Sequence, residues 1–286
     1  MTATTSTNTE TNHEPVLPQK GIRTDTARKE AKTSISPLET ITQSFSMAYR
    51  GVLKIRHNPE QLFDVTFQPI IFTLLFTYVF GGAISGDVTS YLPVIIPGIM
   101  VQTVVMTSIV TGTQLREDMD KGVFDRFRSL PISRISPLAG ALLADVIRYF
   151  VATVLTVIMG IIMGWRPDAF GVVASALLIM VCSFALSWIF ALMGCLMSKA
   201  SAVQGVSMMI MFPLTFASNA FAPTDTMPGW LQAWVKVNPV SHLVSAVRDL
   251  TTDGHMSSHV GWSLLGAAVV TAIFAPLAVR AYMRNA

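Results

Sequence analysis

Charged residues are scarce in this chain of 286 amino acids, at 13% of the total, whereas 51% of the residues are hydrophobic and the mean hydropathy is +0.53. Soluble domains carry charge on about 25% of their residues. Beyond Leu62 the charges gather in short stretches between long apolar runs. This composition excludes a soluble globular protein. The net charge of +3 gives no sign of nucleic-acid binding, because basic residues beside membrane spans explain it.

Cysteine is also rare, with Cys182 and Cys195 as the two examples. Both lie in one apolar run, where a helix would separate them by about 20 Å. That distance is too long for a disulfide, so we expect two packing residues.

Recognisable catalytic motifs are missing. The sequence contains no G-x-x-x-x-G-K-[ST] to hold ATP phosphates, no H-E-x-x-H and no G-x-S-x-G. His255 and His259 have the spacing of a zinc-binding helix, but Met256 stands where glutamate belongs. We therefore predict a protein that is not an enzyme, with no metal site and no cofactor of its own.

Six apolar runs are long enough to cross a bilayer, which takes about 20 residues. We predict an all-α integral membrane protein whose membrane domain covers residues 62–286. The six predicted transmembrane helices are Val65–Ala83, Leu92–Gln114, Leu138–Trp165, Phe170–Met197, Val203–Phe221 and His259–Tyr282.

Basic residues predict the orientation of these spans. They are frequent before the first span, after the second span and at the C-terminus, and sparse in the alternate loops. Loops rich in Lys and Arg stay in the cytoplasm, so both termini are expected there. Residues 1–35 lack the apolar core of a secretory signal and predict a disordered cytoplasmic tail.

Two further segments are expected to lie at the membrane surfaces. Residues 36–58 combine apolar side chains at helical spacing with basic residues, which predicts an interfacial amphipathic helix. Pro59 ends this helix before the first span. It could be an anchor or could gather substrate from the inner leaflet. On the other side, residues 222–258 predict an external helical hairpin that bends at Asn238-Pro239, with Trp230 and Trp234 at the membrane boundary.

The cytoplasmic loop 115–136 is the most informative stretch. It is densely charged, yet Val123, Phe124, Phe127 and Leu130 recur at helical spacing. This pattern predicts a short amphipathic helix that docks on the membrane surface, the protein's own core or a soluble partner. Of the three, docking on a soluble partner leads to a function, because the chain has no motif of its own for using ATP.

Asp145 and Arg148 are the charged residues inside the third predicted span. Their spacing of three positions lets them pair on one helix face. They could form a structural ion pair, a gate or substrate contact, or a proton relay, although the nearby arginine argues against the relay by keeping Asp145 ionised.

Several motifs together resemble one family. The run from Lys121 to Pro131 resembles the charged loop of type-2 ATP-binding-cassette exporter permeases. The run Phe212–Phe221 resembles their fifth span, and Met227–Leu231 followed by Asn238–Ser241 resembles their external hairpin. Lys54–Leu62 resembles, more narrowly, the daunorubicin/doxorubicin-resistance permeases of actinobacteria. The resemblance extends from about Ala48 to Arg284.

This resemblance implies a half-transporter in the bacterial cell membrane. Such permeases pair as homodimers or heterodimers, each subunit binds a separate cytoplasmic ATPase that carries ATP and Mg, and members export amphipathic drugs, lipids, glycolipids or polysaccharide. The ATPase-docking residues predicted on this basis are Lys121, Gly122, Val123, Phe124, Asp125, Arg126, Phe127 and Arg128. The candidates for a substrate path are Gln102, Thr103, Thr107, Thr111, Asp145, Arg148, Met208, Phe212, Thr215, Phe216 and Asn219.

Two alternatives to a drug exporter remain. The same machinery could export an envelope lipid, glycolipid or polysaccharide, since a fold does not fix its cargo. A proton-coupled secondary transporter could use Asp145 or Asp64, but no internal inverted repeat is visible. A membrane scaffold or sensor is disfavoured by the small loops.

Overall fold

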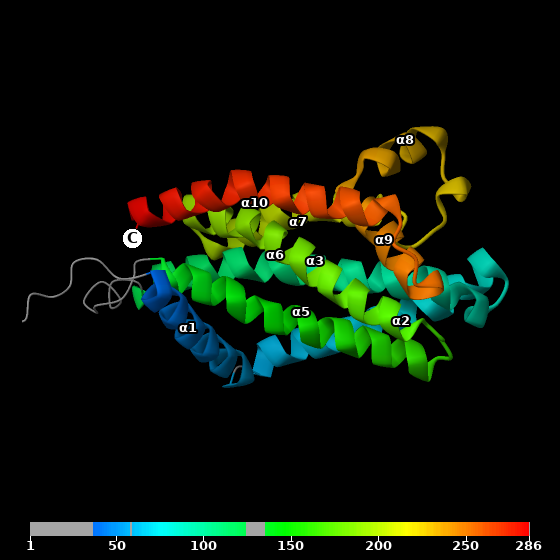
Figure 1. Cartoon of the computed structure of the whole chain (residues 1–286), viewed down its shortest axis with the longest axis horizontal. Helices are drawn as coiled ribbons and strands as arrows, with labels where there is room; N and C mark the ends of the chain where they lie inside the picture. Colours follow the sequence, from blue (N-terminus) through cyan, green and yellow to red (C-terminus); the bar gives the residue numbers. More distant parts are fainter. Residues whose placement is uncertain (1–36, 58, 124–134, 286) are drawn as a thin grey trace, which may run out of the picture. The chain divides into compact units, whose positions relative to one another are not determined.

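The computed structural model describes residues 37–57, 59–123 and 135–285, and these are almost entirely helical, with no strand among them. The predicted all-α class is therefore confirmed. Figure 1 shows the arrangement. The helices are α1 (Pro37–His57), α2 (Pro59–Ser85), α3 (Val88–Asp120), α5 (Ser136–Ile162), α6 (Ala169–Leu196), α7 (Ala200–Phe216), α8 (Gly229–Val237), α9 (Pro239–Asp253) and α10 (Ser258–Asn285), with a 3₁₀ turn η1 (Thr224–Thr226).

Local sequence explains where several helices begin. Asp87 accepts a hydrogen bond from the backbone N–H of Thr89 at the start of α3, and Asp168 accepts one from Gly171 at the start of α6. Asn238 caps α9 in the same way, with Pro239 in its first turn. Side-chain acceptors of this kind satisfy backbone donors that have no partner inside the helix.

Helix α3 lies at the centre of the bundle. It contacts α2, α5, α6, α7 and α9, and almost its whole length is buried. With 33 residues it is about 50 Å long, well beyond the hydrocarbon core of about 30 Å. One continuous helix therefore extends from the membrane core to the charged residues Arg116–Asp120.

Among the described residues, five helices are long and apolar enough to span a membrane: most of α2, together with α3, α5, α6 and α10. The fifth predicted span differs from the expectation, because α7 has 17 residues and ends at Phe216 instead of Phe221. Ala217 closes the helix, and the chain then turns. The length of α7 is at the lower limit for a span, so the count of six remains a prediction.

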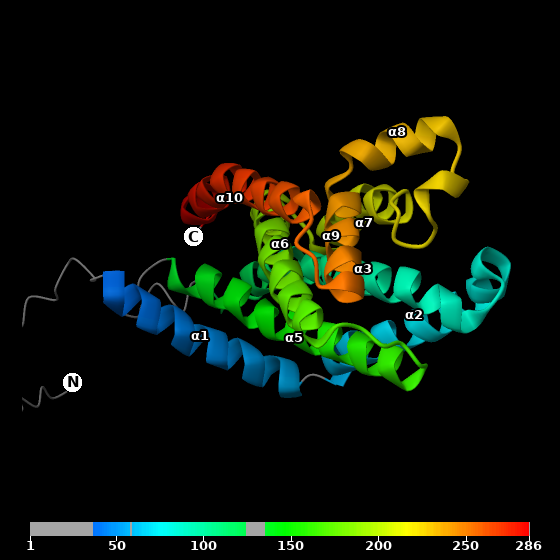
Figure 2. The same cartoon turned by 45° about the vertical axis from the view of Figure 1, so that its right-hand side comes forward.

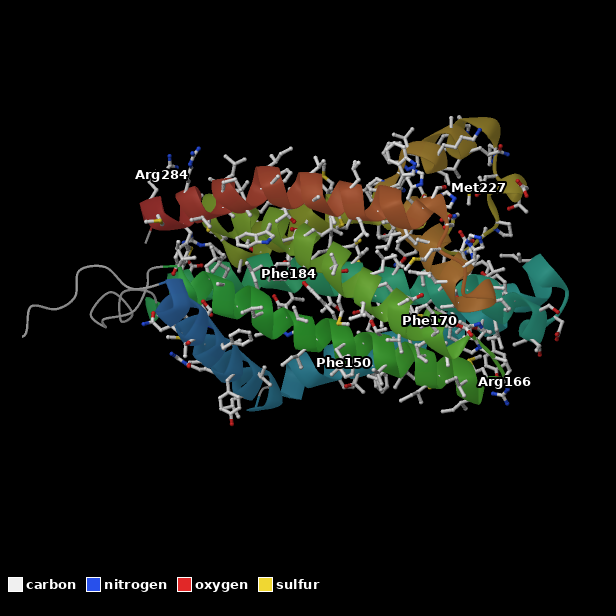
Figure 3. The ribbon with its side chains drawn as sticks, in the orientation of Figure 1. Phe150, Arg166, Phe170, Phe184, Met227 and Arg284 are labelled. Atoms are coloured by element: carbon white, nitrogen blue, oxygen red, sulfur yellow. The ribbon has the colours of Figure 1, made fainter. Side chains whose placement is uncertain are left out.

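The spans run between two ends of the bundle. Figure 3 shows Arg284 at one end and Arg166 and Met227 at the other, which we name the Arg284 end and the Arg166 end. Helix α1 packs along α5, so that a Cβ atom at Gly140 would overlap Met47, while Phe45 and Tyr49 remain exposed. At the Arg166 end, α8 stands off the bundle, whereas α9 is buried in it (Figures 1 and 2).

Candidate functional site

The Arg284 end of α3 carries a row of charges. Arg116 pairs with Asp120, and the Lys121 Nζ lies 3.2 Å from a carboxylate oxygen of Glu117. Both pairs join positions four residues apart on the solvent-exposed end of the helix. The sequence pattern had assigned these residues to the loop. In the structure they lie at the end of the central helix instead.

Gly122 ends this helix. Its φ of +64° lies in the left-handed region, where glycine avoids the steric cost that other residues meet. Its N–H donates to the carbonyl of Met119 over 3.0 Å. This is a common way to stop a helix and redirect the chain. Of the predicted docking residues, Lys121 and Gly122 lie in this turn and Val123 follows it directly. The others are outside the described residues: Phe124, Asp125, Arg126, Phe127 and Arg128.

Asp145 and Arg148 form a buried ion pair. The Nη1 atom of Arg148 lies 2.7 Å from Oδ1 of Asp145. Both partners also reach α3: Thr111 donates to Oδ2 of Asp145 over 2.5 Å, and the Nη2 atom of Arg148 donates to Gln114 over 3.0 Å. The four side chains connect α3 to α5, and the two charged residues are only 3% exposed.

Polar residues of α3 nominated for a substrate path lie inside the subunit. Gln102, Thr103 and Thr107 are buried, and Thr107 donates to the carbonyl of Thr103 on its own helix. Thr215 on α7 behaves in the same way, with its hydroxyl 2.8 Å from the carbonyl of Met211. These side chains face protein, so the described structure does not bring them together on an open surface.

Two of the candidates, Phe212 and Phe216, belong to an aromatic ladder of six stacked rings. The rings of Phe212 and Phe216 stack with centroids 4.2 Å apart, and Phe216 stacks on Phe221 at 5.1 Å. Phe221 then stacks at 4.4 Å on Phe76 of α2. The ring centroid of Phe76 in turn lies 5.5 Å from that of Phe72 and 5.4 Å from that of Phe80.

Part of the ladder is open to the surroundings of the subunit. Phe80 and Phe212 are exposed, as are Met208 and Met209 beside the ladder on α7. Stacked rings and methionines adapt well to flat apolar ligands.

Arg248 of α9 secures the Arg166 end. Its Nη2 atom donates to the carbonyls of Val94 and Asn219, each over 3.0 Å. Burial lowers the pKa of the Arg248 guanidinium, while Asp249 and Tyr91 act in the opposite direction. The side-chain amide of Asn219 donates to Ser245 over 2.8 Å. Asn219, another predicted path residue, therefore anchors the loop after α7 to α9.

Four of the six ladder residues were not predicted from the sequence: Phe72, Phe76, Phe80 and Phe221. The first three recur every fourth residue, a spacing that places them along one helix face. That signal was available in the sequence. The contact of Phe221 with α2 was not, because it depends on how distant segments pack.

Comparison with known proteins agrees with this architecture. The ABC-2 type transporter family matches residues 42–251. The daunorubicin resistance ABC transporter permease protein DrrB1 of Streptomyces coeruleorubidus is 41% identical over 244 residues, covering 85% of this chain and 86% of that protein. The probable doxorubicin resistance ABC transporter permease protein DrrC of Mycobacterium tuberculosis is 26% identical over 60% of this chain and 63% of its own length. The putative transport permease ycf38 of Cyanophora paradoxa is 25% identical over 85% of this chain and 83% of its length.

A helical bundle with long apolar spans and one buried central helix defines a multi-pass membrane protein. Since the matched region covers most of the chain and includes α3 with its charged end, this chain belongs to the ABC-2 type transporter family. It is a permease of that family.

Proposed function

We propose that this chain is the transmembrane subunit of an ATP-driven exporter of amphipathic drugs of the daunorubicin type. The observation that carries the proposal is the 41% identity, over 85% of the chain, to a permease named for daunorubicin resistance. The aromatic ladder supports it, because stacked phenyl rings suit a cargo with a flat aromatic ring system.

The Arg284 end of the bundle is the cytoplasmic end in this proposal. It carries the basic residues whose distribution predicts that side. A separate ATPase subunit, which would hold ATP and Mg, binds the segment that starts at Lys121. The exposed charges of Glu117, Asp120 and Lys121 form part of the rim around that contact.

Force from the ATPase would reach the membrane core through α3. The helix is continuous from Val88 to Asp120, and the buried network around Asp145 holds it to α5. A push at the cytoplasmic end therefore moves α3 and α5 as one body. Two permease subunits, identical or different, would rock against each other and expose the path for the drug between them.

Proton coupling through Asp145 fits the structure less well. Both oxygens of its carboxylate are engaged, one by Arg148 and one by Thr111, and the residue is 3% exposed. A proton carrier must exchange with water on both sides of the membrane, and this carboxylate is enclosed by its partners.

Efflux of daunorubicin from a deletion strain tests the proposal. Restoring the gene should lower drug accumulation, and ATP depletion should abolish the effect, whereas an uncoupler added while ATP is maintained should not. Unchanged drug accumulation together with an altered envelope lipid profile would replace the drug by a lipid cargo. Efflux that survives ATP depletion and collapses with the uncoupler would contradict the ATP-driven mechanism.

A further inference from the structure

A pair of histidines at the Arg166 end has no part in the transport account. His242 lies on α9 and His259 in the first turn of α10, and their Nδ1 atoms are 3.1 Å apart. Both side chains are partly exposed, so ions can reach them. The ring of Trp262 is stacked against that of His242, with centroids 6.3 Å apart and an angle of 25° between the ring planes.

Hydrogen bonding determines the tautomer of each neutral histidine ring. The Nε2 atom of His242 is 3.0 Å from the carbonyl oxygen of Lys236. A carbonyl can only accept, so this nitrogen carries the hydrogen and the Nδ1 atom of His242 presents its lone pair. The Nδ1–H of His259 therefore donates to that lone pair. Its Nε2 atom is left as an acceptor.

We propose that His242 and His259 chelate a divalent transition-metal ion, with Zn²⁺ as the probe, through their two Nδ1 atoms. Zinc binds imidazole nitrogen at about 2.0–2.1 Å in tetrahedral geometry, which places two ligating nitrogens about 3.3 Å apart. The observed 3.1 Å is close to this spacing, and the two rings would turn so that both Nδ1 lone pairs point at the ion. When the ion enters, the hydrogen on Nδ1 of His259 leaves and Nε2 gains one, so a neutral pair releases no net proton.

The surroundings of His242 fit this role. A histidine that ligates a metal usually donates its other N–H to a carbonyl or carboxylate, which orients the ring. The carbonyl of Lys236 already does this. From the sequence we considered the pair His255 and His259 and predicted no metal site, because the glutamate of the zinc motif is absent. In the structure His259 faces His242, while His255 is exposed.

Two protein ligands make an exchangeable site. Across residues 37–57, 59–123 and 135–285, no group of three or more His, Cys, Asp or Glu could hold a metal. Water would therefore complete the coordination, and the ion would be a modulator instead of a structural element. It would hold α9 to α10, and so stiffen the part of the bundle in which Arg248 connects α9 to α3.

Calorimetric titration with Zn²⁺ tests the inference on the intact protein in detergent, purified through a tag without histidine. We expect about one zinc ion per chain, and loss of one ligand of a chelate should weaken binding at least tenfold in His242→Gln and His259→Gln. His255→Gln is the matched control and should bind as the wild type does. Zinc should also raise the melting temperature of the wild type and of the control, but not of the two ligand variants.

Three results would overturn the site: no binding by the wild type, equal binding by all three variants, or loss of binding in His255→Gln with binding retained in His242→Gln. Glutamine keeps a hydrogen-bonding amide, and melting without zinc checks that each variant is folded. The readout needs no transport, so a negative result leaves the proposed export function intact.

Discussion

Arg148 donates a hydrogen bond of 2.7 Å from Nη1 to Oδ1 of Asp145, three positions earlier on α5, and each residue is 3% exposed. A charge near the bilayer centre costs about 2.5–3.5 kcal/mol on insertion scales. The pair lowers this cost because each charge has a partner, and Thr111 and Gln114 supply further hydrogen bonds from α3. The ion pair and its hydrogen bonds with Thr111 and Gln114 thus connect α5 to α3.

Removing one partner should destabilise the protein strongly. Arg148→Met leaves the carboxylate of Asp145 buried without its cation, for which we expect a loss of about 3 kcal/mol. Thermal unfolding in detergent, followed by the loss of monodisperse protein, measures the effect.

The double variant Asp145→Leu/Arg148→Met is the informative control. It removes both charges, and should recover most of the lost stability because no unpaired charge remains. Arg116→Met breaks an exposed pair with Asp120 and should cost less than about 1 kcal/mol. If the single Arg148→Met variant melted like the wild type, the structural role of the pair would be wrong.

Gly112 and Gly194 allow α3 and α6 to approach closely. A Cβ atom at Gly194 would overlap the carbonyl of Gly112, and one at Gly112 would overlap the carbonyl of Phe190. Small residues permit such close packing between membrane helices. Gly194→Val should therefore cost about 1–3 kcal/mol or more in unfolding free energy. Gly261→Ala is the control, because no atom lies within 4 Å of its added Cβ, and its stability should not fall.

The aromatic ladder should matter for transport more than for folding. Truncating Phe76 or Phe216 to alanine removes stacking worth about 0.5–1.5 kcal/mol, which corresponds to roughly a two- to twelvefold decrease in daunorubicin efflux. Phe150→Ala is the matched control, since this phenyl group is 53% exposed on α5, outside the ladder (Figure 3). Equal loss of efflux in all three variants at equal expression would argue against a role for the ladder.

Arg248 should hold α9 to α3 and to the segment after α7 at the Arg166 end. Arg248→Met leaves the carbonyls of Val94 and Asn219 without its hydrogen bonds, at a cost of about 2 kcal/mol. Protease sensitivity of the segment after α7 should increase, because Asn219 loses one of its attachments to α9. Lys236→Met, an exposed change on α8, is the control and should leave cleavage unaltered.

The long spans could be predicted because bilayer thickness sets their length and charge marks their ends. The bend at Asn238-Pro239 was also readable, since asparagine caps a helix and proline favours its first turn. The end of the fifth span was not. The apolar run continues to Phe221, but the helix closes at Ala217, and hydropathy does not report that turn.

Positions within the site were harder to predict. Helix α3 is apolar on all sides and buried on all sides, so its sequence gives no periodic signal for which face lines a path. Gln102 and Thr107 are buried inside the subunit, and their place on a substrate path stays a prediction. The pairing of His242 with His259 joins two helices and leaves no pattern in the sequence.

Co-purification from native membranes in mild detergent tests the central claim most directly. The tagged wild-type permease should bring down a soluble ATP-binding subunit in about equal amount. The Phe127→Asp variant should still reach the membrane but should no longer bring down the ATP-binding subunit, because a charge in the apolar centre of a contact disrupts docking. Drug resistance should be lost as well. Recovery of the tagged permease alone, even after crosslinking, would contradict the claim that this chain is the membrane half of an ATP-driven exporter.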